Sequence, residues 1–364
     1  MNVLLFGPFN GRSRDNESLM RKFIELGHKV YFLTTEEGTH ILPVLEKMGV
    51  YGYRMNIHSS SKIGLLRQVI FLVRFIRKHK IHVVFSHLEP ASFIAVLAQR
   101  FVKARIVVVR HHSDLFLLNN MSHVFSYRYI YNNAKDIIVV SHHSKKIMVE
   151  KEGFKAELIH VIPLSFDFSK FDQPNPAAVA AIKASMNVEL YLLSVGRLVA
   201  NKRFTLSVEI LKRLREQGIN AGLFIVGEGE LQPELQQLIE SYRLTDYCKL
   251  EGYKANVMDY IEASDIFLHP SESEASSLVI KEAGLRKKVV IACEEVGDCG
   301  EYIQNGQNGF LLSKENYIAE TVQTIATHLL EKEKRQQIGN NLYRSIFELY
   351  DVEKNINYYT PFLS

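Results

Sequence analysis

The sequence predicts an α/β protein made of two doubly wound domains. Strand-like apolar runs alternate with helix-like segments along most of the 364 residues, the order that parallel sheets with helices on both faces require. The chain is also long for a single hydrophobic core. Residues 171–177 contain two prolines among polar side chains, as interdomain linkers often do. We therefore expect one domain over residues 1–170 and a second over residues 171–345.

In the first half, strand candidates follow one another at the spacing of β-α-β units. Residues 2–7 and 29–35 are apolar, and segment 16–26 between them has helical periodicity and a stop signal at Gly27. The glycine-containing loop at residues 9–13 lacks the G-x-G-x-x-G pattern of dinucleotide-binding proteins. Further buried strands are expected at residues 83–86, 106–109 and 136–141.

Residues 63–80 combine bulky apolar and basic side chains in one predicted helix. The basic ones are Arg67, Arg74, Arg77, Lys78 and Lys80. Such a helix can lie at an anionic membrane surface. The alternative is a core helix whose basic last turn complements the helix dipole.

Charge is distributed unevenly between the two halves. Residues 1–170 hold 24 Lys and Arg against 13 Asp and Glu, and residues 171–364 hold 20 against 27. The first half is therefore expected to face an anionic surface or substrate. The sequence shows no nucleic-acid recognition motif, so nucleic acid is not an expected partner.

Hydropathy favours a cytoplasmic protein. No apolar run approaches the roughly 18 to 20 residues that a membrane span needs, and the N-terminal segment lacks the charged start of a signal peptide. The basic helix leaves open a peripheral association with the inner face of the membrane. Cys248, Cys293 and Cys299 match neither a disulfide framework nor a common zinc pattern, so we interpret them as packing residues.

A polar cluster directly follows the predicted strand at residues 106–109. It reads Arg110-His111-His112-Ser113-Asp114. In an open parallel sheet, ligands bind beyond the carboxyl ends of the strands, which is where this cluster falls. His111 and His112 are therefore candidate ligand-binding residues, although adjacent histidines are also common as surface or capping features.

The second half repeats the alternation, with strands expected at residues 190–195, 221–226, 249–253 and 289–292 and a helix at residues 202–217. Arg197 and Lys202 follow the first of these strands. A planar guanidinium beside a point charge suits a diphosphate. Taken alone, two such cations would more often be surface residues.

Residues 265–283 read as a strand, a polar loop and a helix that starts near Ser276 and Ser277. The first amides of a helix lack internal partners and can bind an anion. Glu274 and Glu282 lie on either side of this turn. Because carboxylates repel phosphate, they would contact the hydroxyl groups of a ligand whose anionic group binds here. The alternative is a capped helix with two solvated glutamates. The candidate amides belong to Ser276, Ser277, Leu278 and Val279.

Three motifs occur in a defined order: Gly196-Arg197-Leu198 followed by Lys202, then Val226-Gly227-Glu228-Gly229, then Glu274 with Glu282 eight residues later. Together they resemble the retaining nucleotide-sugar glycosyltransferases of family 4. The resemblance implies the GT-B fold, in which two Rossmann-like domains face each other across a cleft. It also implies a hairpin at residues 302–312 and a C-terminal segment, residues 346–364, that returns to the first domain.

The resemblance implies transfer of a hexosyl group from a nucleoside diphosphate sugar to a hydroxyl of a sugar or lipid-linked acceptor, in cell-surface polysaccharide or glycolipid synthesis. The family's roles fall on His111, Glu274, Arg197 and Lys202 as catalytic residues. Glu282 would bind the ribose, and no metal or cofactor is expected. Donor contacts would come from Gly196, Gly227, Tyr253, Ser276, Ser277, Leu278 and Val279, and acceptor-side contacts from Gly11, His111 and His112.

Two segments depart from the family pattern. Ala275-Ser276-Ser277 stands where the family has Gly-Phe-Gly, and Leu164-Ser165 stands where it has Asn-Gly. Side chains then occupy space where glycines allow close approach to a ligand. Two alternatives stay open: a sugar-nucleotide epimerase of the same fold, and a non-catalytic nucleotide-sugar-binding protein.

Overall fold

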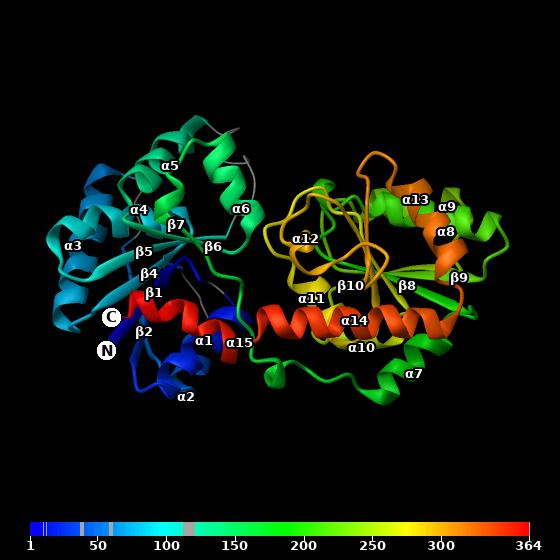
Figure 1. Ribbon diagram of the computed structural model, residues 1–364, viewed down its shortest axis with the longest axis horizontal. Coiled ribbons are helices and arrows are strands. Elements are labelled where there is room, and N and C mark those ends of the chain that lie inside the picture. Colours follow the sequence, from blue (N-terminus) through cyan, green and yellow to red (C-terminus); the bar gives the residue numbers. More distant parts are fainter. Residues whose placement is uncertain (10, 12, 37–39, 58–60, 112–120, 364) are drawn as a thin grey trace. The chain divides into compact units, whose positions relative to one another are not determined.

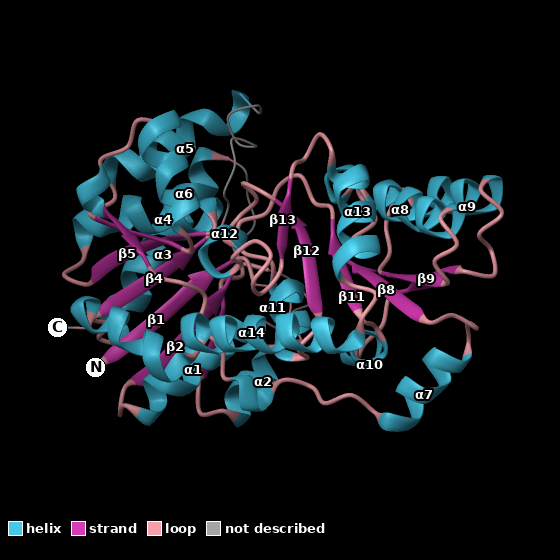
Figure 2. Cartoon of the chain, turned by 45° about the vertical axis from the view of Figure 1, so that its right-hand side comes forward, coloured by secondary structure: helices cyan, strands magenta, loops and turns pink. Residues whose placement is uncertain are grey.

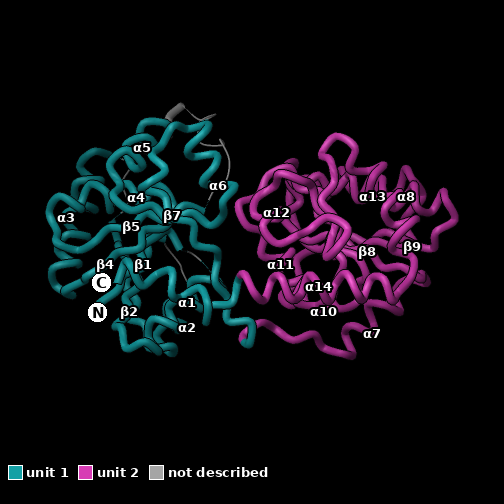
Figure 3. Tube along the Cα trace, in the orientation of Figure 1, with its two compact units in different colours: residues 1–169, 350–364 teal, residues 170–349 magenta. Residues whose placement is uncertain are grey.

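The computed structural model describes the whole chain except residues 10, 12, 37–39, 58–60, 112–120 and 364. It contains two compact units, coloured separately in Figure 3. Unit 1 comprises Met1–Ser169 and Tyr350–Ser364, and unit 2 comprises Lys170–Leu349. Each unit is built around its own parallel sheet.

Unit 1 contains a seven-stranded parallel sheet in the order β3-β2-β1-β4-β5-β6-β7 (Figure 1). Its central strands are buried on both faces, which explains their continuous Val, Ile, Leu and Phe runs. The strands are β1 (Asn2–Gly7), β2 (Lys29–Thr34), β3 (Tyr51–Arg54), β4 (Val83–His87), β5 (Arg105–Arg110), β6 (Asp136–Val139) and β7 (Ile159–Val161).

Helices cover both faces of this sheet (Figure 2). One core contains side chains from α1 (Arg14–Glu25), and cores on the other face contain side chains from α3 (Lys62–Lys78), α4 (Glu89–Ala98) and α5 (Met121–Asn133). The other helical elements are α2 (Leu42–Lys47), η1 (Gln99–Phe101), α6 (His142–Lys146), η3 (Ile147–Lys151), η4 (Ala156–Leu158), η5 (Phe168–Lys170), α15 (Val352–Asn355) and η7 (Ile356–Phe362).

The C-terminal segment belongs to the core of unit 1. The Tyr359 ring lies 5.9 Å from that of Phe23 and 5.7 Å from that of Phe85, measured between centroids. The backbone N–H of Phe166 donates to the Tyr350 carbonyl at 2.8 Å, and that of Val352 donates to the Phe166 carbonyl at 3.1 Å. Aromatic packing and backbone pairing thus hold the end of the chain on this unit.

Unit 2 contains a six-stranded parallel sheet in the order β10-β9-β8-β11-β12-β13. The strands are β8 (Leu190–Val195), β9 (Ala221–Val226), β10 (Cys248–Gly252), β11 (Ile266–His269), β12 (Val289–Cys293) and β13 (Phe310–Leu312). The helices are α7 (Pro176–Ala184), η6 (Ala200–Lys202), α8 (Phe204–Glu216), α9 (Gln232–Ser241), α10 (Met258–Ala263), α11 (Leu278–Leu285), α12 (Cys299–Tyr302), α13 (Tyr317–His328) and α14 (Lys332–Tyr350). The predicted pair of doubly wound, parallel-sheet domains is confirmed.

Two local predictions were wrong. The helix expected from residue 202 begins at Phe204, because Lys202 ends the short helix η6 and Arg203 adopts a left-handed conformation with φ of 51°. Residues 302–312 do not form a hairpin: Tyr302 ends α12, a turn closes between Gly306 and Gly309, and β13 then pairs in parallel with β12. Among the described residues, none of the helices combines the length and apolar character that crossing a bilayer demands.

Candidate functional site

The strand order of unit 2 places its central polar residues at a topological switch point. From β8 the chain continues to β9 and β10 on one side, and it returns to β11 on the other side of β8. The loops that follow β8 and β11 therefore diverge at the carboxyl edge of the sheet, where open α/β sheets bind ligands. Lys202 belongs to the first loop and Glu274 to the second.

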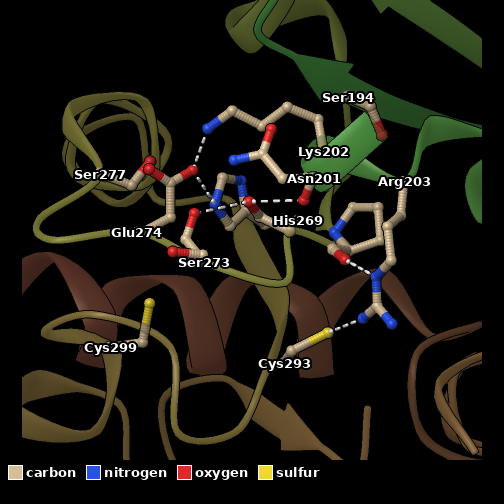
Figure 4. Close-up of polar contacts among 12 residues, drawn as sticks. Ser194, Asn201, Lys202, Arg203, His269, Ser273, Glu274, Ser277, Cys293 and Cys299 are labelled. Atoms are coloured by element: carbon tan, nitrogen blue, oxygen red, sulfur yellow. Dashed lines mark hydrogen bonds and ion pairs between the residues drawn. The ribbon is translucent and has the colours of Figure 1, made fainter. Parts of the chain in front are cut away.

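Lys202, Glu274 and His269 form one polar group at this edge, shown in Figure 4. Glu274 Oε1 accepts a hydrogen bond from Lys202 Nζ and lies 3.1 Å from His269 Nε2. The Lys202 and Glu274 side chains are 16% and 15% exposed. Burial alone raises the pKa of Glu274, but the hydrogen bond and charge of His269, together with the charge of Lys202, lower it to about 2. The carboxylate is therefore ionised at neutral pH.

Arg203 holds the loops around this group together. Its Nε donates to the Pro270 carbonyl at 2.8 Å, and its Nη2 donates to Cys293 Sγ at 3.0 Å (Figure 4). The backbone N–H of Glu272 donates to the Asn201 carbonyl at 2.8 Å. These contacts tie the loops after β8 and β11 to each other and to the last residue of β12. Burial raises the pKa of the Cys293 thiol to about 11, consistent with its interpretation as a packing residue.

The two glycine motifs meet at the neighbouring strand ends. A Cβ on Gly227, whose φ is +140°, would lie 1.9 Å from the Gly196 carbonyl oxygen, so the crossing of the two loops requires glycine there. Arg197 follows this crossing; its side chain is exposed, and among the described contacts it makes none with the Lys202 group. Tyr253 is also exposed, and its backbone N–H donates to Glu228 Oε1 at 3.3 Å.

The N-terminus of α11 lies where the sequence places it. Ser277 is the N-cap residue, and Leu278 and Val279 are the first residues of the helix. The amides of a first helical turn have no intrahelical acceptors, so they can bind an anion. Glu282 is buried in the next turn of the same helix.

A buried ion pair that the sequence analysis missed lies behind this N-terminus. Lys281 Nζ and Asp298 Oδ2 are 2.8 Å apart, and both side chains are fully buried. Ser276 Oγ donates to the same Asp298 oxygen at 2.5 Å, and Lys281 Nζ donates to the Ser277 carbonyl at 3.2 Å. A Cβ on Gly297 would lie 2.9 Å from the Ala275 carbonyl oxygen, so the loop after β12 packs directly against the turn.

Unit 1 has a second polar group at the carboxyl ends of β4 and β5, next to its own switch point between β1 and β4. His87 ends β4, and its Nδ1 lies 2.8 Å from Nε2 of His111, which follows β5. Burial, and secondly the nearby His111, hold the pKa of His87 well below its ordinary value. A cavity of about 20 Å³ beside the pair is lined in part by Asp15, Asn16 and Tyr359 and has room for about one water molecule.

Of the other acceptor-side candidates, His112 lies outside the described residues. Gly11 is described, and no atom other than those of its chain neighbours lies within 4 Å of a Cβ built on it, so the fold itself does not require glycine there. His87 was not predicted, although its place at the end of an apolar strand was a usable signal. The roles of His269, Arg203, Lys281 and Asp298 were not predicted either.

Comparison with known proteins places both halves of the chain among glycosyltransferases. A family described as "Glycosyltransferase Family 4" matches residues 9–170, and one described as "Glycosyl transferases group 1" matches residues 181–345. The phosphatidylinositol N-acetylglucosaminyltransferase gpi3 subunit of Schizosaccharomyces pombe is 23% identical over 346 residues, covering 92% of this chain and 74% of the relative. A putative colanic acid biosynthesis glycosyltransferase of Escherichia coli, WcaL, is 26% identical over 195 residues, covering 52% and 46%.

Solved structures show the same fold. The Anabaena protein HepE in complex with UDP superposes with a TM-score of 0.83 at 20% identity, covering 100% of this chain and 99% of that chain. The same protein with UDP-glucose gives a TM-score of 0.80 at 18% identity, with the same coverage. The predicted GT-B architecture is therefore confirmed.

The buried pair behind α11 makes a prediction about stability. Lys281→Met leaves the Asp298 carboxylate buried without its cation, so we expect the free energy of unfolding to fall by about 3 to 5 kcal/mol. Asp298→Asn in the Lys281→Met background removes that charge and should restore part of the loss. Urea unfolding followed by circular dichroism measures both. Lys334→Met, on the exposed side of α14, is the control and should change stability by less than about 0.5 kcal/mol. If Lys281→Met lowers the free energy of unfolding by less than about 1 kcal/mol, the buried Lys281–Asp298 ion pair is contradicted.

Glu274 makes a prediction about pH. Its pKa is about 2 in the folded chain and 4.5 ordinarily, so the ionised carboxylate contributes stability that is complete above about pH 5 and lost as pH falls towards 2. The stability difference between the natural chain and Glu274→Gln should therefore reach at most about 3 kcal/mol at neutral pH and shrink on acidification. Melting temperatures between pH 2.5 and 7 test this. A stability difference for Glu274→Gln that is constant with pH would refute this prediction.

Proposed function

We propose that this chain, which belongs to the two-domain glycosyltransferases, transfers a hexosyl group from a nucleoside diphosphate sugar to an acceptor hydroxyl with retention of the anomeric configuration. The observation that carries the proposal is the Lys202–Glu274 pair at the switch point of unit 2, beside the N-terminus of α11. This arrangement offers positive charge to a diphosphate and an ionised carboxylate to sugar hydroxyls within one small group. The UDP and UDP-glucose bound by HepE support a donor of this class.

Electrostatic stabilisation of the leaving diphosphate is the chemical task that Lys202 and Arg197 would perform. An ammonium has three N–H donors, so Lys202 can contact a phosphate oxygen while it still holds Glu274. The amides of Ser277, Leu278 and Val279 would add fixed partial positive charge. Each well-placed donor of this kind lowers a barrier by a few kcal/mol.

In the transfer step, the bond between the anomeric carbon and the diphosphate oxygen breaks and a bond to the acceptor oxygen forms on the same face. The acceptor's hydroxyl proton goes to the departing phosphate, so no carboxylate of the protein needs to act as a nucleophile. Glu274 would hold hydroxyls of the donor sugar, and Glu282 would accept hydrogen bonds from the ribose. The crossing of Gly196 and Gly227 would let the backbone approach the nucleotide, with the base near Tyr253.

The acceptor side of the proposal rests on unit 1. The neutral His87 supports His111 through a short contact, and His111 would approach the acceptor hydroxyl or the donor sugar. We propose an acceptor in the class of sugars or lipid-linked sugars used for cell-surface polysaccharides or glycolipids, which places the enzyme in the cytoplasm or at the inner face of the membrane. The names of the fission-yeast and Escherichia coli relatives, which mention phosphatidylinositol and colanic acid, support this class.

Nucleotide binding is the first test. In a thermal-shift screen of UDP, GDP, ADP and their common sugars, we expect one nucleotide at a hundred times its Kd to stabilise unit 2 by about 3 kcal/mol, a shift of several degrees. Arg197→Ala and Lys202→Ala should reduce the shift, while Lys334→Ala should leave it unchanged. No shift with any nucleotide would contradict the proposal. Donor turnover without acceptor would identify an epimerase instead, and tight binding without turnover a nucleotide-sugar-binding protein.

Metal independence is part of the proposal, because Lys202, Arg197 and the α11 amides supply the positive charge that a diphosphate needs. The sequence contains no Asp-x-Asp motif. We expect the transfer rate to stay within about twofold when EDTA is added or when Mg²⁺ is supplied in excess. Activity that chelation abolishes and Mg²⁺ restores would overturn this part of the mechanism.

A further inference from the structure

Helix α3 exposes a face that is apolar at one end and basic at the other. Each helical residue advances by about 100°, so residues 63, 66, 67, 70, 74, 77 and 78 lie on one side. Ile63, Leu66 and Ile70 are 67%, 59% and 41% exposed on this side. The opposite side is buried in the core of unit 1 through Val69, Leu72, Phe75 and Ile76. The exposed aliphatic side chains are therefore not needed for folding of the helix onto the sheet.

A groove of about 660 Å³ lies along one flank of this face, between its exposed side chains and the buried Phe75. Tyr53, Phe71 and Phe75 contribute aromatic surface to it, and Arg67, Arg74 and Lys78 contribute positive charge. The aromatic side chains can pack against an apolar part of a ligand, and the cations beside them can bind an anionic group on the same ligand. No acidic side chain is among the residues that line this groove.

A second groove, also of about 660 Å³, lies at the C-terminal end of the same helix. Arg77, Lys80, Arg100 and Lys103 line it, together with Phe101, whose side chain is 59% exposed. Arg77 Nη2 donates to the Phe101 carbonyl at 2.8 Å, which fixes η1 against α3. Residues 54–105 contain ten Lys and Arg and a single acidic residue, Glu89. We call this combined surface, the exposed face of α3 with both grooves, the α3 surface.

We propose that the α3 surface docks unit 1 on an anionic lipid bilayer. Lipid phosphates would occupy the two basic grooves, and Ile63, Leu66, Ile70 and Phe101 would enter the headgroup region. Interfacial helices bind membranes through this combination of buried apolar area and attraction to anionic lipids. A soluble polyanion would contact the cations but leave the three aliphatic side chains in water. A second copy of the same surface would bring like charges together, which disfavours a symmetric dimer.

Vesicle flotation of the full chain tests the proposal without donor or acceptor, so its outcome is independent of the transferase assignment. We expect binding to phosphatidylcholine vesicles that contain phosphatidylglycerol, little binding to pure phosphatidylcholine, and release as NaCl is raised. Arg67→Gln, Arg74→Gln and Lys78→Gln combined should weaken binding roughly 100-fold, because each basic residue near such a surface contributes about 1 kcal/mol. The exchange of these three cations, R67K/R74K/K78R, should retain binding.

The matched control removes the same charge from elsewhere on unit 1. Lys135, Lys146 and Lys155 are exposed, and their combined replacement by Gln should leave vesicle binding within about threefold of the natural chain. Ile63→Ser, Leu66→Ser and Ile70→Ser combined should weaken binding at least tenfold with little change in melting temperature. Three results would each overturn the proposal: an equal loss of vesicle binding in the control variant, equal binding to neutral vesicles, and normal binding by the serine variant. The last result, with competition by heparin, would indicate a soluble polyanion instead.

Discussion

The ion pair between Lys202 and Glu274 determines how the loops of unit 2 can be arranged. It joins residues that are 72 apart in the chain, and it forms only if the turns after β8 and β11 both leave the sheet at its carboxyl edge. Removing two charges from water is costly, and the contact of His269 Nε2 with the same carboxylate oxygen, at 3.1 Å, offsets part of that cost. Arg203 then connects Cys293, the last residue of β12, to the same loops.

The Lys281–Asp298 pair holds the residues at the start of α11 in place. Glycines at the start of such a helix allow a ligand to approach the backbone, whereas this chain has Ala275, Ser276 and Ser277. Ser276 turns its hydroxyl towards Asp298, and Lys281 holds the Ser277 carbonyl from within the helix. The Ser276 side chain therefore points into the protein and leaves the first amides of α11 uncovered by it.

Much of the fold was predictable because parallel strands buried on both faces leave continuous apolar runs, as at residues 2–7 and 221–226. The start of α8 was not predictable, because nothing in the sequence indicates that Arg203 would adopt a left-handed conformation before the helix. In the site, local motifs located Glu274 and Lys202 separately, but their pairing depends on strand order. Lys281 was not predicted because a lysine on a helix is normally exposed to solvent. Its partner Asp298 lies 17 residues further along the chain, in the loop after β12.

The polar groups near the two switch points differ in charge: unit 2 has an ionised carboxylate and unit 1 has a neutral histidine. In unit 2 the Glu274 carboxylate is held ionised by a lysine and a histidine, a state suited to a ligand rich in charge and hydroxyl groups. In unit 1 burial keeps His87 neutral, so its contact with His111 needs one nitrogen to donate and the other to accept. A proton on one ring then fixes the tautomer of the other. The neutral His87 ring thus orients His111 at the carboxyl edge of the unit 1 sheet through this hydrogen bond.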